Sequence, residues 1–239
     1  MQDNRFASAD AVRSAQIDVG LRSYMLGVYN HMTTALALTG FAAFGTKLAV
    51  TAMPSLGMAL FGSPLMYVVM FAPLAMVMWL SFRINAMSPA KARSVFYAYA
   101  LVMGLSLTTI LFAFTGSSVA RAFFITAGAF AALSIYGYTT KRDLTALGAF
   151  LIVGVVGLLL ASIVNIFVAS AGMEFIISIV GVLLFAGLTA YDTQKIKSMY
   201  SAGDDKATAA RKSIFGALTL YLDFINMFLF LLRLIGNRE

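Results

Sequence analysis

Two aspartates are unusual because their carboxyl groups fall within long apolar stretches of the chain. Asp192 belongs to the segment G-L-T-A-Y-D-T-Q-K-I-K, and Asp223 belongs to L-T-L-Y-L-D-F-I-N-M. An ionisable side chain inside a bilayer is energetically unfavourable, and it usually faces a partner, a cavity or an ion path. The sequence therefore points to chemistry that two carboxyl groups perform together, provided that they meet.

A pair of carboxyl groups in a medium of low dielectric constant has two distinct states. Both groups cannot ionise easily when they are within hydrogen-bonding reach, so one keeps a proton and the pair titrates as a unit. When both are ionised they repel each other, and their oxygens become ligands for a hard divalent cation such as Ca²⁺. Asp192 and Asp223 are thus the candidate pH-sensing and transient Ca²⁺-binding residues, and we expect no required cofactor.

Two other interpretations of these aspartates stay open. In a structural one, Asp192 extends to the membrane surface and Asp223 is only a buried hydrogen-bonding group. In an enzymatic one, the pair activates water, as in intramembrane aspartyl proteases. Those enzymes carry Gly-x-Gly before the second aspartate and a Pro-Ala-Leu motif, whereas Leu220-Tyr221-Leu222 precedes Asp223 and the second motif is missing. We therefore expect that the protein is not an enzyme.

A helical hairpin would bring the two carboxyl groups to a similar depth. If the first helix continues to about Tyr200, Asp192 lies roughly 12 Å from its end. If the next helix begins near Lys212, Asp223 lies roughly 16 Å inside it. The polar segment between them, S-A-G-D-D-K-A-T-A-A-R-K, is typical of a connection between helices. This spacing permits the meeting without proving it.

The composition indicates an all-α polytopic membrane protein. Hydrophobic residues make up 61% of the 239 residues and charged residues only 11%, against about half and a quarter in soluble domains. The absence of cysteine excludes disulfides and thiolate sites, and a single histidine excludes a His-rich metal site. Basic residues lie in the loops, where they indicate topology rather than a nucleic-acid partner.

Seven apolar runs are long enough to cross about 30 Å of hydrocarbon as helices. They fall roughly at 24–46, 62–82, 94–115, 119–138, 144–169, 174–194 and 213–235. The chain is thereby divided into a cytoplasmic N-terminal segment (1–22), a single transmembrane domain (23–236) and a short C-terminal tail (237–239). Pro54 and Gly57 indicate a loop, while Pro73 is expected to free the carbonyl of Val69 and to act as a hinge.

The distribution of lysine and arginine predicts the orientation. With the N-terminus inside, the inner segments hold 13 of the 17 basic residues, and the outer segments hold Lys47, Arg121, Arg233 and Arg238. This bias predicts a cytoplasmic N-terminus and an outer C-terminus. The last helix is expected at the centre, because Asp223 lies in mid-span and needs shielding from lipid.

Three segments carry a family resemblance that extends over residues 20–236. They are G-L-T-A-Y-D-T-Q-K-I, L-T-L-Y-L-D-F-I-N-M-F-L-F-L-L-R, and Y-G-Y-T-T-K-R-D-L at Tyr136–Leu144. The chain resembles the Bax inhibitor-1 family, the transmembrane Bax-inhibitor-motif proteins, and specifically its bacterial branch. The resemblance implies two layers of three helices around a central last helix, in the bacterial inner membrane.

The resemblance also implies a function, that of a pH-sensitive calcium leak channel gated by an aspartate dyad. Asp192 and Asp223 match the dyad, and Arg83 matches an arginine of the second helix that interacts with it. Tyr191 and Asn226 lie beside the dyad in the sequence and are weaker candidates. The implied partners are lipid, calcium ions and protons.

The alternative function is a membrane regulator that binds and modulates a membrane-anchored ATP-dependent protease or another membrane protein. Residues 1–22 could be the handle for such a partner, although their mixed charges equally suit a solvated tail.

Overall fold

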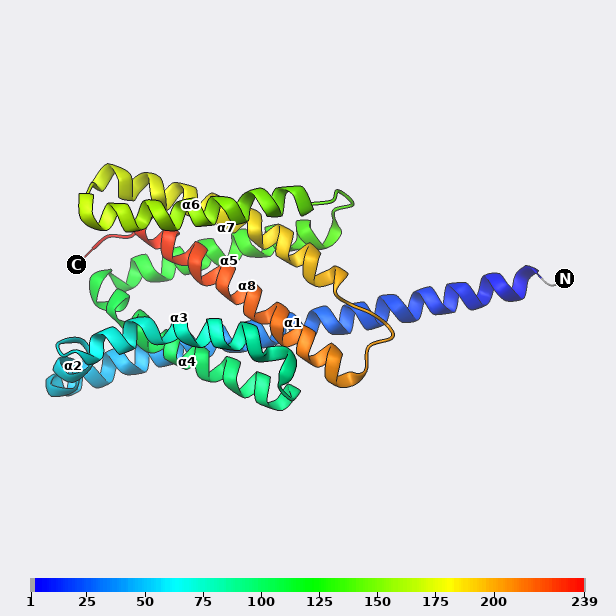
Figure 1. Ribbon diagram of the computed structural model, residues 1–239, viewed down its shortest axis with the longest axis horizontal. Helices are drawn as coiled ribbons and strands as arrows, with labels where there is room; N and C mark the ends of the chain where they lie inside the picture. The colour runs from blue at the N-terminus through cyan, green and yellow to red at the C-terminus, as the bar shows by residue number, and fades with distance from the viewer. Residues whose placement is uncertain (1–2, 239) are drawn as a thin grey trace.

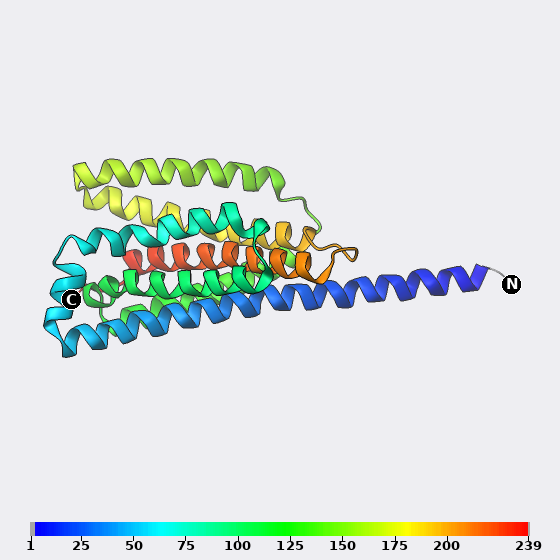
Figure 2. The ribbon, with the colours of Figure 1, turned by 60° about the horizontal axis from the view of Figure 1, so that its bottom comes forward.

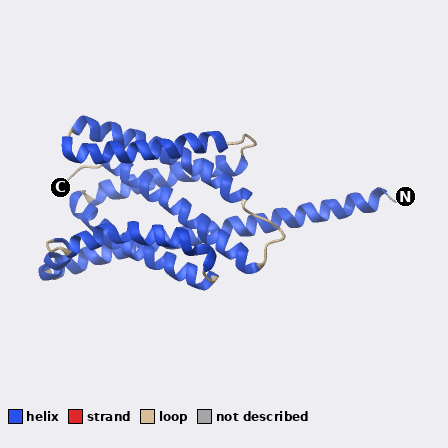
Figure 3. Ribbon diagram, in the orientation of Figure 1, coloured by secondary structure: helices blue, strands red, loops and turns tan. Residues whose placement is uncertain are grey.

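The protein is described by a computed structural model over residues 3–238, and its elements are helices joined by short connections (Figure 3). The helices are α1 (Asp3–Ala52), α2 (Pro54–Phe61), α3 (Leu65–Arg83), α4 (Pro89–Ala113), α5 (Gly116–Thr139), α6 (Thr145–Val168), α7 (Ala171–Ser198) and α8 (Lys206–Ile235), with a single 3-10 turn, η1, at Ile84–Ala86. Seven helical segments within these residues are long and apolar enough to cross a membrane. The predicted count of seven spans is confirmed.

Polar caps extend several helices beyond their apolar runs. The carboxylate of Asp205 accepts a hydrogen bond of 3.0 Å from the amide of Thr208, so α8 begins at Lys206 rather than near Lys212. The hydroxyl of Ser88 accepts a bond from the amide of Lys91 at the start of α4. Such caps satisfy amides that have no partner within the helix. Helix ends therefore depend on polar residues that an apolar run does not include.

The segment after the first span differs from the prediction. Pro54 and Gly57 were expected in a loop, but they belong to the eight-residue helix α2. Pro54 occupies the first turn, where its missing amide hydrogen leaves no bond unmade. None of the residues of α2 is buried. The loop prediction was wrong because proline and glycine are compatible with a short exposed helix when proline begins it.

Two groups of three helices enclose the last helix. α1 and α3 pack on α4 in one group, and α5 and α6 pack on α7 in the other. α8 runs obliquely between them and contacts α1, α4, α5 and α7 (Figure 1). Its Tyr221 is fully buried, with its ring 5.8 Å from that of Phe96 and 5.7 Å from that of Tyr99. The expected central position of the last helix, with two layers around it, is confirmed.

A proline lies inside the second span. Pro73 is buried in α3, where it cannot donate a hydrogen bond to the carbonyl of Val69. The hydroxyl of Ser106, on α4, donates a hydrogen bond to that carbonyl instead. The break in the backbone ladder of α3 is therefore also a point of attachment to α4.

The first helix is longer than a bilayer is thick. α1 spans 50 residues, about 75 Å at 1.5 Å per residue, against about 30 Å of hydrocarbon. It continues without a break across residues 22 and 23, and its N-terminal part projects from the bundle (Figure 2). The apolar part, Val19–Ala52, packs on α4 and α8.

Candidate functional site

The two aspartates meet between α7 and α8. Asp192 is 9% exposed and Asp223 is 4% exposed, and their carboxyl groups are within hydrogen-bonding reach of each other. Asp192 lies six residues before the end of α7, about 9 Å, whereas Asp223 lies 17 residues after the start of α8, about 26 Å. The oblique course of α8 compensates for this difference (Figure 1). The meeting of the two groups therefore depends on the crossing of the helices as well as on the length of the connection.

Glycines on both sides of the pair set the register of the two helices. A Cβ on Gly181 would lie 2.5 Å from the ring of Phe230, and a Cβ on Gly216 would lie 2.9 Å from Ile196 Cγ2. Each glycine thus receives a large side chain from the other helix, and small residues of this kind allow close helix contacts in membranes. The carboxyl groups lie between these two contacts and are held opposite each other.

One oxygen of the pair has no donor in the described part of the chain. Oδ2 of Asp223 is buried and accepts no hydrogen bond from any described residue. An ionised carboxylate only accepts hydrogen bonds, so two carboxylates cannot satisfy each other. A proton on either group would supply the missing donor. The arrangement can therefore bind a proton between the two aspartates.

Arg83 was the cation expected to act on this pair. Arg83 is exposed at the end of α3, and no ion pair within residues 19–238 joins it to either aspartate. Lys195 is the cation whose charge acts on Asp192, and it lies one turn further along α7. Sequence reasoning did not single out Lys195, although its spacing of three residues from Asp192 places both on one helical face.

Neither of the two weaker candidates forms a hydrogen bond with the pair in residues 19–238. Tyr191 packs on α6, because a Cβ on Gly148 would overlap its ring. The side-chain amide of Asn226 donates a 2.8 Å hydrogen bond to the carbonyl of Leu222, in its own helix. Tyr191 is adjacent to Asp192, and adjacent residues in a helix point in different directions, since each turn takes 3.6 residues.

A row of hydroxyl groups beside the pair was not predicted. Oη of Tyr29 lies 2.6 Å from Oγ of Ser134, which lies 2.9 Å from Oγ1 of Thr193, the residue after Asp192. These hydrogen bonds connect α1, α5 and α7. Single hydroxyl residues carry little signal in a sequence, because most bond to the backbone of their own helix, as Thr193 also does to Thr189.

Comparison with known proteins identifies the family. The profile described as "Inhibitor of apoptosis-promoting Bax1" matches residues 21–239. Inner membrane protein YbhL of Escherichia coli is 42% identical over 239 residues, 99% of this chain and 100% of YbhL. An uncharacterized protein of Rickettsia prowazekii is 44% identical over 95% of this chain and 94% of its own length. An uncharacterized membrane protein of Streptococcus pyogenes is 34% identical over 96% and 99%. Since these matches extend along nearly the whole chain, the protein belongs to the Bax inhibitor-1 family.

Proposed function

We propose that the protein is a pH-sensitive calcium leak channel of the bacterial inner membrane, gated by Asp192 and Asp223. The buried, unpaired Oδ2 oxygen of Asp223 beside a second carboxyl group is the observation that carries the proposal. The inner-membrane location rests on the name of the similar YbhL protein of Escherichia coli. The cytoplasmic N-terminus and the outer C-terminus rest on the distribution of basic residues.

The gate works through the protonation of the pair. With one proton shared, the carboxyl groups hydrogen-bond and hold α7 against α8. When the proton leaves, two negative charges face each other in a buried site and push the helices apart unless a cation compensates. Lys195 compensates in part, and Arg83 would contribute only if α3 moved towards the pair.

Calcium is the transported ion in this proposal and not a resident cofactor. Proteins that retain Ca²⁺ supply most of about six to eight oxygen ligands. In residues 19–238 no group of three or more acidic, histidine or cysteine side chains gathers. Two carboxylates without a third acidic ligand are better suited to transient binding of a permeating Ca²⁺ than to tight binding of a resident one.

Calcium flux into liposomes, measured across pH, tests the proposal. Asp192→Asn and Asp223→Asn each remove a titrating group and keep its shape, so each should flatten the pH dependence of the flux. The double variant should resemble the single ones, because the pair titrates as a unit. The infrared band of a protonated carboxyl group, present in the wild type, should disappear in the double variant.

Asp143→Asn is the matched control. Asp143 is an exposed aspartate in the connection between α5 and α6, so its removal should leave the pH profile of the flux unchanged. A wild-type profile in both dyad variants would remove the pair from the gate. It would leave the aspartates with the structural role described above.

A second function, regulation of a membrane protein partner such as an ATP-dependent protease, is favoured by the projecting end of α1 (Figure 2). A helix that leaves the bundle offers a surface that calcium passage does not need. Removal of residues 2–18 should therefore abolish control of a partner protease and spare the flux. Loss of flux in this truncation, with the fold intact, would contradict the separation of the two roles.

A further inference from the structure

Two cavities lie end to end between α1 and α5. The first, of about 720 Å³, extends along α1 from Arg22 to Leu36, and the second, of about 420 Å³, extends from Leu36 to Lys47. They share Leu36, Phe123 and Phe224, the last from α8. α1 and α5 belong to different three-helix groups, and α8 is the main connection between these groups. The seam between the groups is therefore a groove with α8 as its floor.

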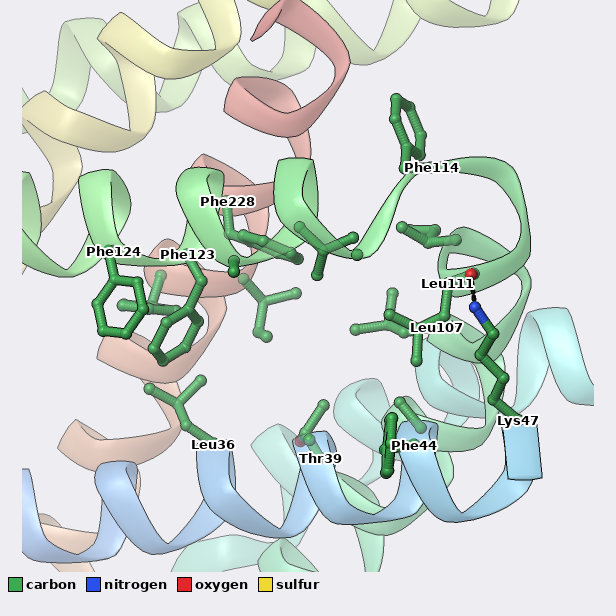
Figure 4. A pocket seen from close by; sticks show the side chains of 18 residues that line it. Leu36, Thr39, Phe44, Lys47, Leu107, Leu111, Phe114, Phe123, Phe124 and Phe228 are labelled. Carbon is green, nitrogen blue, oxygen red and sulfur yellow. Dashed lines mark hydrogen bonds between the residues drawn. The ribbon is translucent and has the colours of Figure 1, made fainter. Parts of the chain in front are cut away.

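The groove opens towards the lipid. Leu26 and Ile135 line the first cavity and are more than half exposed, as is Phe124 in the second. Figure 4 shows the second cavity, with Phe123 and Phe124 of α5 on one side and Leu36 of α1 on the other. Apolar side chains exposed within a membrane span face hydrocarbon, so an acyl chain can enter the groove from the side.

Two of the hydroxyl groups in the wall of the first cavity are paired with each other. Tyr29 and Ser134 both line it, and their oxygens lie 2.6 Å apart. Paired hydroxyls do not need a polar ligand. The middle of the cavity therefore suits an apolar chain.

The two ends of the groove differ in charge. Arg22 is exposed at the mouth of the first cavity and forms no ion pair with a described residue. Across the mouth, Tyr138 lies under Lys197, whose Nζ is 4.8 Å from the ring centroid and donates a 2.8 Å hydrogen bond to the Tyr138 carbonyl. At the other end, Lys47 donates a hydrogen bond to the Leu111 carbonyl (Figure 4). Its Nζ also lies 5.3 Å from the centroid of the Phe112 ring. The positive charge available to a ligand is thus at the Arg22 end.

The length of the first cavity fits one lipid leaflet. Arg22 and Leu36 are 14 residues apart, about 21 Å along α1, and half of the hydrocarbon core is about 15 Å thick. A phosphate placed at Arg22 would leave room for one acyl chain as far as Leu36. We infer that this cavity is a binding site for one anionic phospholipid, whose phosphate contacts Arg22 and whose acyl chain lies between α1 and α5.

Native mass spectrometry of the purified protein tests this site, with phosphatidylglycerol and phosphatidylethanolamine as the added lipids. The wild type should retain one phosphatidylglycerol in preference to phosphatidylethanolamine. Arg22→Gln should reduce the binding of phosphatidylglycerol about tenfold, as expected for the loss of a charge-assisted hydrogen bond to phosphate. Arg93→Gln removes an exposed arginine of α4 that does not line the cavity, and it should not change the binding.

A matched pair of alanines tests the path of the acyl chain. Ala131 lines the first cavity, while its exposed neighbour Ala132 does not. Ala131→Phe should abolish retention of the lipid, and Ala132→Phe should preserve it, with gel filtration confirming that both variants fold. Equal binding of the two lipids by the wild type, or retention by Ala131→Phe, would overturn the proposal. A dimer that is lost in Ala131→Phe would show that a second copy occupies the groove instead.

Discussion

At the scale of single residues, the described aspartates include two contrasting kinds of carboxyl group. Asp143 and Asp205 lie in connections and accept hydrogen bonds from backbone amides, at 2.9 Å from Thr145 and 3.0 Å from Thr208. Bonds from the hydroxyl and the amide of the threonine lower the pKa of each of these aspartates. Asp223 has a buried oxygen with no such donor. The first kind is stabilised as an anion, whereas the second has no donor that would stabilise its charge.

The cap of α8 should make stability depend on pH in the acid range. Because the folded-state pKa of Asp205 is lowered, its contribution to stability is present above the ordinary aspartate pKa and is lost as the pH falls through the folded value. Asp205→Asn caps the helix without titrating. The wild type should therefore melt at a higher temperature than Asp205→Asn near neutral pH.

The melting temperatures of the two proteins, measured in detergent, should converge as the pH falls from about 6 to about 3. A difference that stays constant over this range would show that the charge of Asp205 does not stabilise α8.

Sequence reasoning found the two paired residues but not their surroundings. Asp192 and Asp223 were identifiable because carboxyl groups in apolar runs are rare and need partners. The direction of Tyr191 and the pairing of Ser134 with Thr193 depend on how three helices are rotated about their axes. A single sequence does not determine such rotations, because its spans are apolar on most of their faces.

At the scale of helices, glycines determine how closely α5 approaches α7. A Cβ on Gly137 would overlap the backbone oxygen of Ala190, which cannot turn away as a side chain could. Gly137→Ala should therefore destabilise the protein by about 1–3 kcal/mol, the range for overpacking. Gly128, on the same helix, has no atom within 4 Å of such a Cβ.

Gly128→Ala is the matched control, and it should be neutral or stabilising by up to about 1 kcal/mol, since alanine favours helix. Denaturation followed by the fluorescence of Trp79, the only tryptophan, compares the two variants. If Gly137→Ala and Gly128→Ala are equally stable, α5 and α7 can move apart without a loss of stability.

The contact between Ser106 and the Val69 carbonyl should restrain α3. Ser106→Ala leaves a carbonyl without its donor and should cost about 1–3 kcal/mol. In a Pro73→Ala background the same change should cost less, because alanine, unlike proline, has an amide hydrogen that can bond to the Val69 carbonyl. Thermal denaturation of the two single variants and the double variant measures the difference.

The distribution of distances between spin labels at the exposed positions Phe82 and Phe150 should also broaden in Ser106→Ala. Such broadening would report that α3 is held less firmly. Thr109→Ala, which removes an exposed hydroxyl of the same helix as Ser106, is the control. Equal costs of Ser106→Ala in both backgrounds would mean that Pro73 and Ser106 act independently.

The helices were largely predictable as apolar runs, whereas the contacts between them were not. A bilayer requires long apolar helices, so seven spans follow from the composition of the runs. The expected hinge at Pro73 took no account of Ser106, which lies 37 residues after Val69 and reaches it only through packing of α3 on α4. α2 was missed because eight residues with no buried side chain carry no periodic pattern.

At the scale of the whole molecule, orientation in the membrane is the remaining prediction. The 13-to-4 division of basic residues predicts that the N-terminus is cytoplasmic and the C-terminus is outside. Alkaline phosphatase fused after Arg238 should therefore be active, and a fluorescent protein fused there should be dark. The opposite result would place the C-terminus inside and exchange the two faces of the bundle.

The central position of α8 was predictable for a physical reason. Asp223 lies in mid-span, and only a helix covered by protein on every side can hold such a group away from lipid. The seam between the two three-helix groups was not predictable, because residues that line the groove are as apolar as those that face lipid. Leu26, which lines the groove, and Phe150, which does not, are both large, exposed apolar side chains.

The order of the helices along the chain also bears on biosynthesis. α8 is the common partner of α1, α4, α5 and α7, and all four precede it in the chain. When translation proceeds from the N-terminus, these helices are inserted before the helix that fills the space between them exists. Asp192 enters the membrane at that stage without Asp223 beside it. The nascent protein must therefore keep its two halves open, and the carboxyl group of α7 protonated or in contact with water, until the ribosome has delivered α8.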